Sequence, residues 1–267
     1  MTESDKAEVG GDFTEVPLPL DCTWVIKDEV IGCCPAFFPY RFTFECEEPV
    51  LVRVTDLFAA GDSYWVYDHG ELLFTMDNAT DYGPTPPWTD DPDTAYDLKT
   101  GPWAHLYRQV EPGEHSITIK AMSMPTGLSN STVAISARPV PRLDVRPGNA
   151  NNVINLRAKG GVLTVALLGS EHVDVTEVDI RFPLHLGAGG ATPIHNLSDP
   201  KVYEDHLQDV NRDGHTDLVL HYRIGQTGIK EGDTSVTFMG KMKVPNSIYD
   251  WFTCSDSIRT VPAKKVK

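Results

Sequence analysis

The chain has 267 residues, of which 38 are acidic and 23 are basic, so its formal net charge at pH 7 is −15. Because phosphate recognition needs a basic surface, this charge excludes nucleic acid as an expected partner. Hydrophobic residues make up 40% of the sequence, which is enough for a core and excludes whole-chain disorder. The longest apolar run is far shorter than the roughly 20 residues that cross a bilayer, so we expect no membrane span.

The first half of the chain has the pattern of a β-protein. Residues 1–20 hold few apolar side chains and are expected to form an irregular N-terminal arm. Short runs rich in β-branched and aromatic residues then alternate with turn residues, which predicts strands at 49–58, 63–67, 72–76, 115–121 and 132–138. Asp68-His69-Gly70 predicts a hairpin turn between the second and third of these strands.

The second half repeats this pattern, with strands expected at 162–168, 178–186, 218–224 and 235–242. Pro139 and Pro141 interrupt the chain between the halves, where regular sheet interior is excluded. The sequence therefore predicts an all-β fold of two jelly-roll-like β-sandwich domains in tandem, at 21–140 and 141–263, followed by a basic tail at 264–267.

Aromatic residues are the main candidates for a ligand surface. Trp88 lies in a long Pro- and Asp-rich loop at 82–97, and Trp103 lies in a second Pro-containing segment. Trp65 and Tyr67 share one face of a strand because they are two residues apart, and core packing is the alternative role for this pair. His69 is a candidate acid or base, with a surface-turn histidine as the alternative.

The sequence Asp209-Val-Asn-Arg-Asp-Gly-His-Thr-Asp has the chemistry of a calcium loop. Asp209, Asn211 and Asp213 supply side-chain oxygens at positions 1, 3 and 5, and His215 offers its backbone carbonyl at position 7. Asp217 follows at position 9. Position 12 is Leu220 rather than the glutamate of an EF-hand, and a strand pattern follows, so we expect a structural calcium site in a β-protein. An acidic turn without metal is the alternative.

The cysteines and glycosylation sequons favour an oxidising compartment. Three sequons start at Asn78, Asn130 and Asn196, and they predict a glycoprotein if the chain is secreted. These features lead us to expect a secreted protein. The polar N-terminus is not a signal peptide, so the signal is expected to be absent from this chain. Four of the five cysteines could form disulfides in the N-terminal segment, with zinc ligation or a nucleophilic thiol as alternatives. The cysteines are Cys22, Cys33, Cys34, Cys46 and Cys254.

Signatures of common enzyme classes are absent from the sequence. It contains no G-x-S-x-G elbow, H-E-x-x-H helix, Walker loop or G-x-G-x-x-G turn in a strand–helix context. The nine histidines show no pair at metal-ligand spacing with a second ligand nearby. We therefore expect no organic cofactor.

Two groups of motifs resemble β-modules of uncharacterised secreted fungal and bacterial surface proteins. The first comprises residues 52–70 with Asp91-Pro-Asp-Thr-Ala and Pro112-Gly-Glu-His-Ser-Ile-Thr-Ile. The second comprises Leu143-Asp-Val-Arg-Pro-Gly-Asn, the predicted calcium loop and Asp256-Ser-Ile-Arg-Thr-Val. The resemblance covers about residues 38–262 and implies no particular activity.

The overall layout is also similar to the hetero-Diels–Alderases of fungal tropolonic sesquiterpenoid pathways. This resemblance implies a cofactor-free pericyclase that joins a tropolone quinone methide to a humulene-type alkene in fungal secondary metabolism. On this hypothesis Trp65, Tyr67, Trp88 and Trp103 would line an apolar cleft, and His69 would donate a hydrogen bond. The sequence contains no diagnostic motif of these enzymes, so the resemblance assigns no catalytic residue to this chain.

The alternative hypothesis is a secreted, calcium-stabilised binding or adhesion module without catalysis. Tandem β-sandwiches bind glycans or protein partners through exposed aromatic residues and loops. The calcium loop, the sequons and the acidity agree with this hypothesis. Its ligand would be a glycan or a protein partner, whereas the pericyclase would take small apolar or aromatic substrates.

Overall fold

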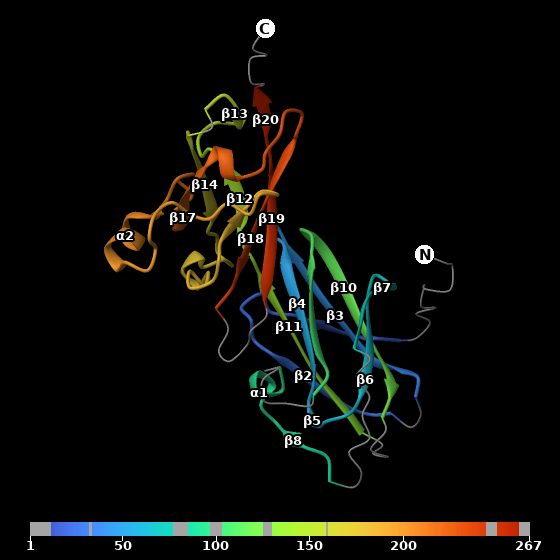
Figure 1. Ribbon diagram of the computed structural model, residues 1–267. Helices are drawn as coiled ribbons and strands as arrows, with labels where there is room; N and C mark the ends of the chain where they lie inside the picture. The colour runs from blue at the N-terminus through green and yellow to red at the C-terminus, as the bar shows by residue number, and fades with distance from the viewer. Residues whose placement is uncertain are drawn as a thin grey trace. The chain divides into compact units, whose positions relative to one another are not determined.

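The computed structural model describes residues 12–31, 34–76, 85–96, 103–124, 130–158, 160–243 and 250–261. The chain divides into two compact units between Pro139 and Val140, each built mainly of strands (Figure 1). The predicted all-β fold is therefore confirmed. None of the helices in the described ranges is long and apolar enough to cross a bilayer.

Unit 1 contains a five-stranded and a four-stranded sheet. The first has the order β1 (Thr14–Pro17), β3 (Ala36–Cys46), β10 (Gly113–Ser123), β6 (Ser63–Asp68), β7 (Glu71–Met76). The second has the order β2 (Val25–Val30), β11 (Asn130–Pro139), β4 (Val50–Asp56), β9 (His105–Val110). A short pair, β5 (Phe58–Ala59) and β8 (Trp88–Thr89), and helix α1 (Pro92–Tyr96) complete the unit.

Part of the predicted irregular arm is a strand. Thr14–Pro17 pairs in parallel with β3, with Thr14 opposite Tyr40 and Pro17 opposite Thr43. Leu18 continues this pairing, since its N–H donates to the carbonyl of Thr43 at 2.8 Å. Leu18 is buried in the core, so the few apolar residues of this segment are the ones that attach it to the sheet.

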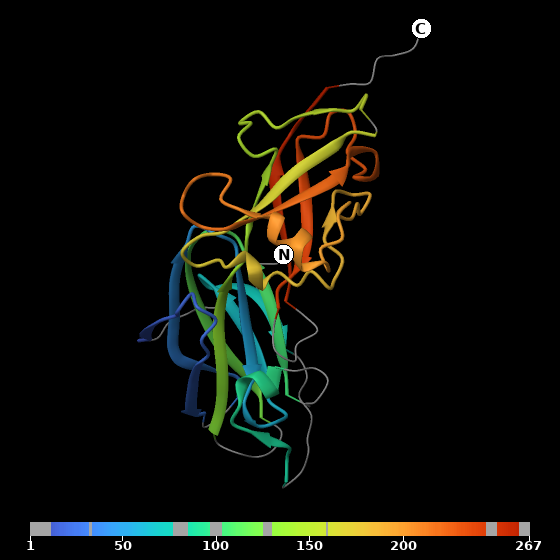
Figure 2. The same cartoon turned by 90° about the vertical axis from the view of Figure 1, so that its left-hand side faces the viewer.

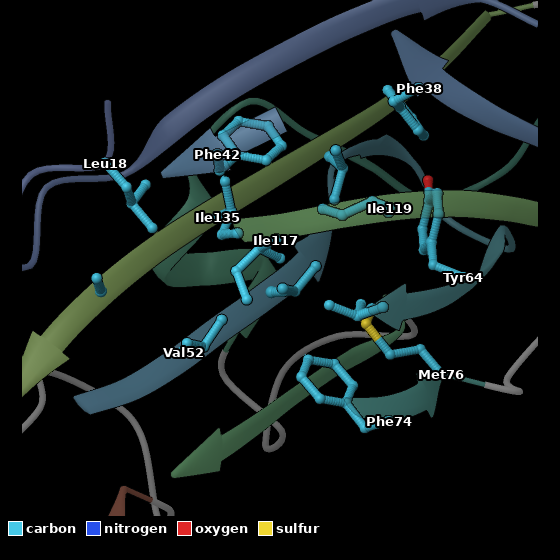
Figure 3. Close-up of a cluster of buried hydrophobic side chains, with 14 of the residues drawn as sticks. Leu18, Phe38, Phe42, Val52, Tyr64, Phe74, Met76, Ile117, Ile119 and Ile135 are labelled. Atoms are coloured by element: carbon cyan, nitrogen blue, oxygen red, sulfur yellow. The ribbon is translucent and has the colours of Figure 1, made fainter. Parts of the chain in front are cut away.

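The core of unit 1 lies between the two sheets. Alternate residues of β3 and β10 point inward, among them Phe38, Phe42 and Ile117, and they meet Val52 and Ile135 from the second sheet (Figure 3). Strand residues alternate between the two faces of a sheet, so this packing follows from the period-2 pattern of the sequence. Full burial of each such side chain contributes about 1.5–3 kcal/mol to folding.

Unit 2 contains three smaller sheets. The largest has the order β12 (Arg142–Val145), β14 (Val162–Leu168), β17 (Asp217–Arg223), β16 (Leu207–Gln208), and Figure 2 shows β14 in yellow-green beside β17 in orange. The others comprise β15 (His185–Leu186), β18 (Ser235–Lys241) and β19 (Trp251–Ser257), and β13 (Val153–Asn155) with β20 (Arg259–Val261). Helix α2 (Pro200–Asp205) and two short 3-10 turns, Val175–Glu177 and Ile224–Gln226, lie between strands.

The strand predicted at 178–186 is wrong over most of its length. Only His185–Leu186 is a strand, and Val178 forms an isolated bridge with Met242. The Asp179 carboxylate accepts hydrogen bonds from the backbone N–H and the guanidinium of Arg181, and the Phe182 N–H donates to the Asp179 carbonyl. These local bonds stabilise a turn that competes with an extended chain.

Candidate functional site

The most exposed large apolar side chain of the described residues is Trp88, which is 62% exposed. It lies on β8, opposite Ala59 of β5. Its ring stacks on Phe58, with centroids 5.6 Å apart and an angle of 12° between the planes. Phe58 has a φ of +63°, a conformation that costs free energy in a bulky residue and that occurs more often at functional positions.

A pocket of about 250 Å³ adjoins this aromatic pair. Its lining combines apolar surface with carboxylate, amide and hydroxyl groups, and comprises Asp28, Leu57, Phe58, Ala59, Asp62, Trp88, Asn130 and Thr132. The Thr132 hydroxyl donates to Asp28 Oδ1 at 2.8 Å, which orients this carboxylate at the rim. An open aromatic plane beside fixed polar groups is the composition of a small-molecule binding site.

A buried hydrogen-bond network supports the pocket. Asp62 Oδ2 accepts from the Ser131 hydroxyl at 2.7 Å and from Tyr64 OH at 3.2 Å. Tyr64 OH also lies 2.9 Å from Asp56 Oδ1, and Asp56 Oδ2 accepts the N–H of Gly61 at 3.1 Å. Burial and the neighbouring Asp62 raise the pKa of Asp56 well above its usual value, and burial also raises the pKa of Asp62. Both carboxyl groups are therefore harder to ionise than exposed aspartates.

Trp103, predicted as a cleft wall, is only 5% exposed and packs beside Leu57 and Ala95. Its indole N–H donates to the Phe58 carbonyl at 3.0 Å. Trp103 therefore fixes the backbone of Phe58 through this hydrogen bond. It is not among the residues that line the pocket.

Trp65 and Tyr67 lie on the face of their sheet that points away from the core. Tyr64 and Val66 occupy the core face of the same strand, as the alternation predicts. Tyr67 is buried against Phe37, with ring centroids 5.6 Å apart, and Trp65 lies opposite Lys120 on β10. The structure thus keeps the predicted pair on one face but does not bring it to the Trp88 pocket.

His69 lies in the predicted hairpin turn, with a φ of +47°. Its Nε2 is 2.9 Å from the carbonyl oxygen of Glu114, so Nε2 carries a proton and donates it. The ring is exposed and does not line the Trp88 pocket.

The predicted calcium loop connects β16 to β17 and is tightly turned. Asp209 accepts the N–H groups of Arg212 at 2.7 Å and Gly214 at 3.1 Å, and Asp213 accepts the N–H of His215 at 2.9 Å. The Asn211 amide donates to Asp213 Oδ2 at 2.7 Å. Gly214 has a φ of +92°, which explains why glycine stands at position 6.

Asp217 closes the base of this loop. Its carboxylate is buried and accepts the N–H of Val210 at 2.8 Å and the N–H of Gly169 at 2.9 Å. Burial raises the pKa of Asp217, and these two hydrogen bonds oppose that effect. Asp217 therefore ties the loop to a neighbouring turn.

The sequence shows no histidine pair at short metal-ligand spacing, but the fold brings three histidines together. His195, His206 and His221 have ring nitrogens that all lie within 4.8 Å of one another. Their separations in sequence match no short metal motif, because strand pairing rather than local spacing brings them together. One sequence feature hinted at the cluster, because His206 and His221 lie on either side of the predicted calcium loop.

Cys46 and Cys254 are buried free thiols. Burial raises the pKa of Cys46 to about 11, and its thiol donates to Glu48 Oε2 at 3.1 Å. Burial raises the pKa of Cys254 as well. A nucleophilic role is therefore disfavoured for both residues, because the thiolate is the reactive form.

No family model and no curated protein matches the chain. Several solved structures show weak similarity to the chain, including the following three. The pre-peptidase C-terminal domain of a Bacillus anthracis collagenase is 10% identical with a TM-score of 0.28, covering 49% of this chain and 99% of that domain. A Bifidobacterium dentium β-glucuronidase is 10% identical with a TM-score of 0.24, covering 90% of this chain and 40% of the enzyme.

The adhesin domain of Epf from Streptococcus pyogenes is also 10% identical, with a TM-score of 0.20, covering 84% of this chain and 71% of that domain. Similarity at these scores carries no argument for a shared fold or a shared function.

Proposed function

We propose that the chain is a non-catalytic binding module that takes a neutral saccharide at the Trp88 pocket. One observation carries the proposal. Trp88 exposes most of its surface and is held flat on Phe58, beside a rim of oxygen and amide groups. An exposed tryptophan does not contribute the free energy that its burial would give to folding. Its exposure therefore supports a role in binding a ligand at this surface.

The chemistry of the pocket suits a sugar ring. The C–H groups of a pyranose pack on an indole plane, and its hydroxyls donate to carboxylate oxygens and exchange hydrogen bonds with amides. Asp28, Asp62 and Asn130 offer such groups around the aromatic surface. The carboxyl groups and the net charge of −15 disfavour acidic sugars, so the proposed ligand is uncharged.

The pericyclase hypothesis is supported less well. Small-molecule sites typically enclose about 300–1,000 Å³. The pocket at Trp88 is about 250 Å³ and would have to hold a terpene together with a quinone methide. This hypothesis predicts a single-enantiomer adduct when the protein is incubated with humulene and a generated tropolone quinone methide, against a control without protein.

Calcium has a structural role in this proposal. Asp209, Asn211 and Asp213 would bind the ion through side-chain oxygens and His215 through its carbonyl. The ion would stabilise unit 2, while the saccharide would bind to unit 1.

The test is binding of the full chain to neutral oligosaccharides of glucose, xylose and mannose, measured on an array and by calorimetry. We expect Trp88→Ala to weaken binding at least tenfold while the melting temperature changes little, because the ring is largely exposed. Leu72→Ala, at another exposed apolar residue, serves as the matched control and should bind normally. Absence of any oligosaccharide binding, or equal binding by Trp88→Ala, contradicts the proposal.

A further inference from the structure

Three histidines of unit 2 converge on β17 from separate parts of the chain. His221 lies on β17, His206 lies between α2 and β16, and His195 lies in the segment before α2. Backbone hydrogen bonds fix this arrangement, because the Val219 N–H donates to the His206 carbonyl at 2.8 Å and the Ile194 N–H donates to the His221 carbonyl at 2.9 Å. The three rings are therefore placed by the sheet.

The rings face one another closely. Their centroids are 5.0 Å apart for His195 and His206, 5.0 Å for His195 and His221, and 5.3 Å for His206 and His221. One ring nitrogen of each lies within 4.8 Å of the others. Zinc–nitrogen bonds of about 2.0–2.1 Å place tetrahedral ligand nitrogens about 3.3 Å apart, so small side-chain rotations would close the set on one ion.

His206 is already oriented as a metal ligand. It is 3% exposed, and its Nδ1 donates a hydrogen bond to the carbonyl of Val219. This bond places the proton on Nδ1 and leaves a lone pair on Nε2, which faces His195 Nδ1 at 2.8 Å. Metal-binding histidines usually donate their second ring N–H to a carbonyl or carboxylate in this way.

His221 supplies a second, independent observation. Its Nδ1 is buried and has no hydrogen-bond partner in the described structure. Buried polar atoms are nearly always paired, and an unpaired one calls for a specific explanation. A hydrogen bond between His195 and His206 alone leaves this nitrogen unexplained, whereas a shared cation explains why all three rings are held together.

We propose that His195, His206 and His221 form a transition-metal site that binds Zn²⁺. Three imidazole nitrogens suit zinc and its neighbours in the first transition row, whereas calcium and magnesium prefer oxygen. Among the described residues, the group offers three protein ligands, so the fourth position is left to water or to a small ligand. His221 also lines a groove of about 650 Å³ with Thr164 and Gln208, which gives access to that position.

The zinc site is distinct from the predicted calcium loop, although the loop joins two of its ligands. His206 precedes β16, the loop spans 209–217, and His221 follows on β17. The loop offers oxygen ligands and the cluster offers nitrogen ligands, so the two sites should select different ions. The proposal also stands apart from the saccharide pocket, which lies in unit 1.

The test is a titration of the untagged, metal-stripped full chain with Zn²⁺ by calorimetry. We expect one zinc ion per chain. His195→Ala and His221→Ala should each weaken binding more than about 100-fold, since changes to groups that only orient a ligand cost 10–100-fold. His172→Ala, at an exposed histidine outside the cluster, is the matched control and should bind zinc normally.

Cobalt substitution provides a second readout that a misfolded variant does not imitate. The Co²⁺-loaded wild type should show the strong visible absorption of tetrahedral cobalt, and Asp213→Ala should retain it because the calcium loop supplies no zinc ligand. Because His195 is exposed, His195→Ala should have the same melting temperature as the metal-free wild type. Failure of the wild type to bind zinc, or full binding by both ligand variants, overturns the proposal.

Discussion

Asp56 combines full burial with a carboxyl group, and its neighbours Asp62 and Tyr64 add no positive charge. Burial is the main reason why the pKa of Asp56 is raised, and the adjacent Asp62 adds to the effect. The folded state therefore holds this proton more tightly than the unfolded chain does. Its contribution to stability is complete below the unfolded pKa and is lost as the pH rises through the folded pKa.

Asp56→Asn tests this argument, because the amide keeps an acceptor for Gly61 and removes the titration. We expect the variant to raise the melting temperature at pH 7 and to leave it nearly unchanged at pH 4. Thermal melts across this pH range make the comparison. A variant that is destabilised equally at both pH values would show that the geometry of the carboxyl group, and not its ionisation, matters.

Two tryptophans of the same region should respond differently to the same substitution. Trp103 is buried and donates a hydrogen bond to Phe58, so Trp103→Ala should cost about 3–5 kcal/mol of unfolding free energy. Trp88→Ala should cost about 0.5 kcal/mol or less, as for most surface changes. Urea unfolding of both variants gives the comparison, and equal losses would contradict the assigned roles.

The sequence could single out these two tryptophans but could not separate them. Both lie near prolines in segments without clear periodicity. What distinguishes them is a hydrogen bond from Trp103 to a residue 45 positions away, and a stack between Trp88 and Phe58 across a short strand pair. Contacts of this range depend on the tertiary fold, which local pattern does not encode.

At the scale of elements, the loop at 209–217 carries a prediction of its own. Asp213→Ala removes the expected calcium ligand at position 5 and should lower the melting temperature in calcium. In protein that has been freed of zinc beforehand and reloaded with calcium, the wild type should lose stability in EDTA, and the variant should lose none. Glu231→Ala, an exposed acidic control elsewhere in unit 2, should keep the EDTA response.

A wild-type melt that is the same in calcium and in EDTA would contradict the calcium assignment. Elemental analysis of the EDTA-treated protein distinguishes a loop that binds no calcium from a loop whose calcium EDTA does not remove.

Elements with a regular alternation could be predicted, and elements set by local side-chain bonds could not. The hairpin of β6 and β7 follows from alternating residues around Asp68-His69-Gly70. The segment 178–184 has similar apolar residues, but the carboxylate of Asp179 stabilises a turn there. The three-histidine cluster lay beyond prediction for a related reason, because it depends on the register between β17 and its neighbours.

The whole molecule should unfold in two steps, because each unit has its own sheets and buried residues. Scanning calorimetry should resolve two transitions. EDTA should shift only the transition of unit 2, and Trp103→Ala only that of unit 1. A single transition that moves as a whole in both experiments would contradict independent units.

Composition and charge predicted the general class of the molecule well. The acidic net charge, the many short strand patterns and the prolines around residue 140 are properties of the sequence itself. The function depends instead on which side chains remain exposed and which are brought together. That information arises only when the strands pair.

The most direct test of the binding proposal is an NMR titration that observes the tryptophan indole N–H signals. The chain has five tryptophans, so each indole can be assigned by substitution. On addition of a bound neutral oligosaccharide, the account predicts the largest shift at Trp88 and little change at Trp251 in unit 2. Shifts at Trp251 or Trp65 with an unperturbed Trp88 would contradict a saccharide site at this pocket.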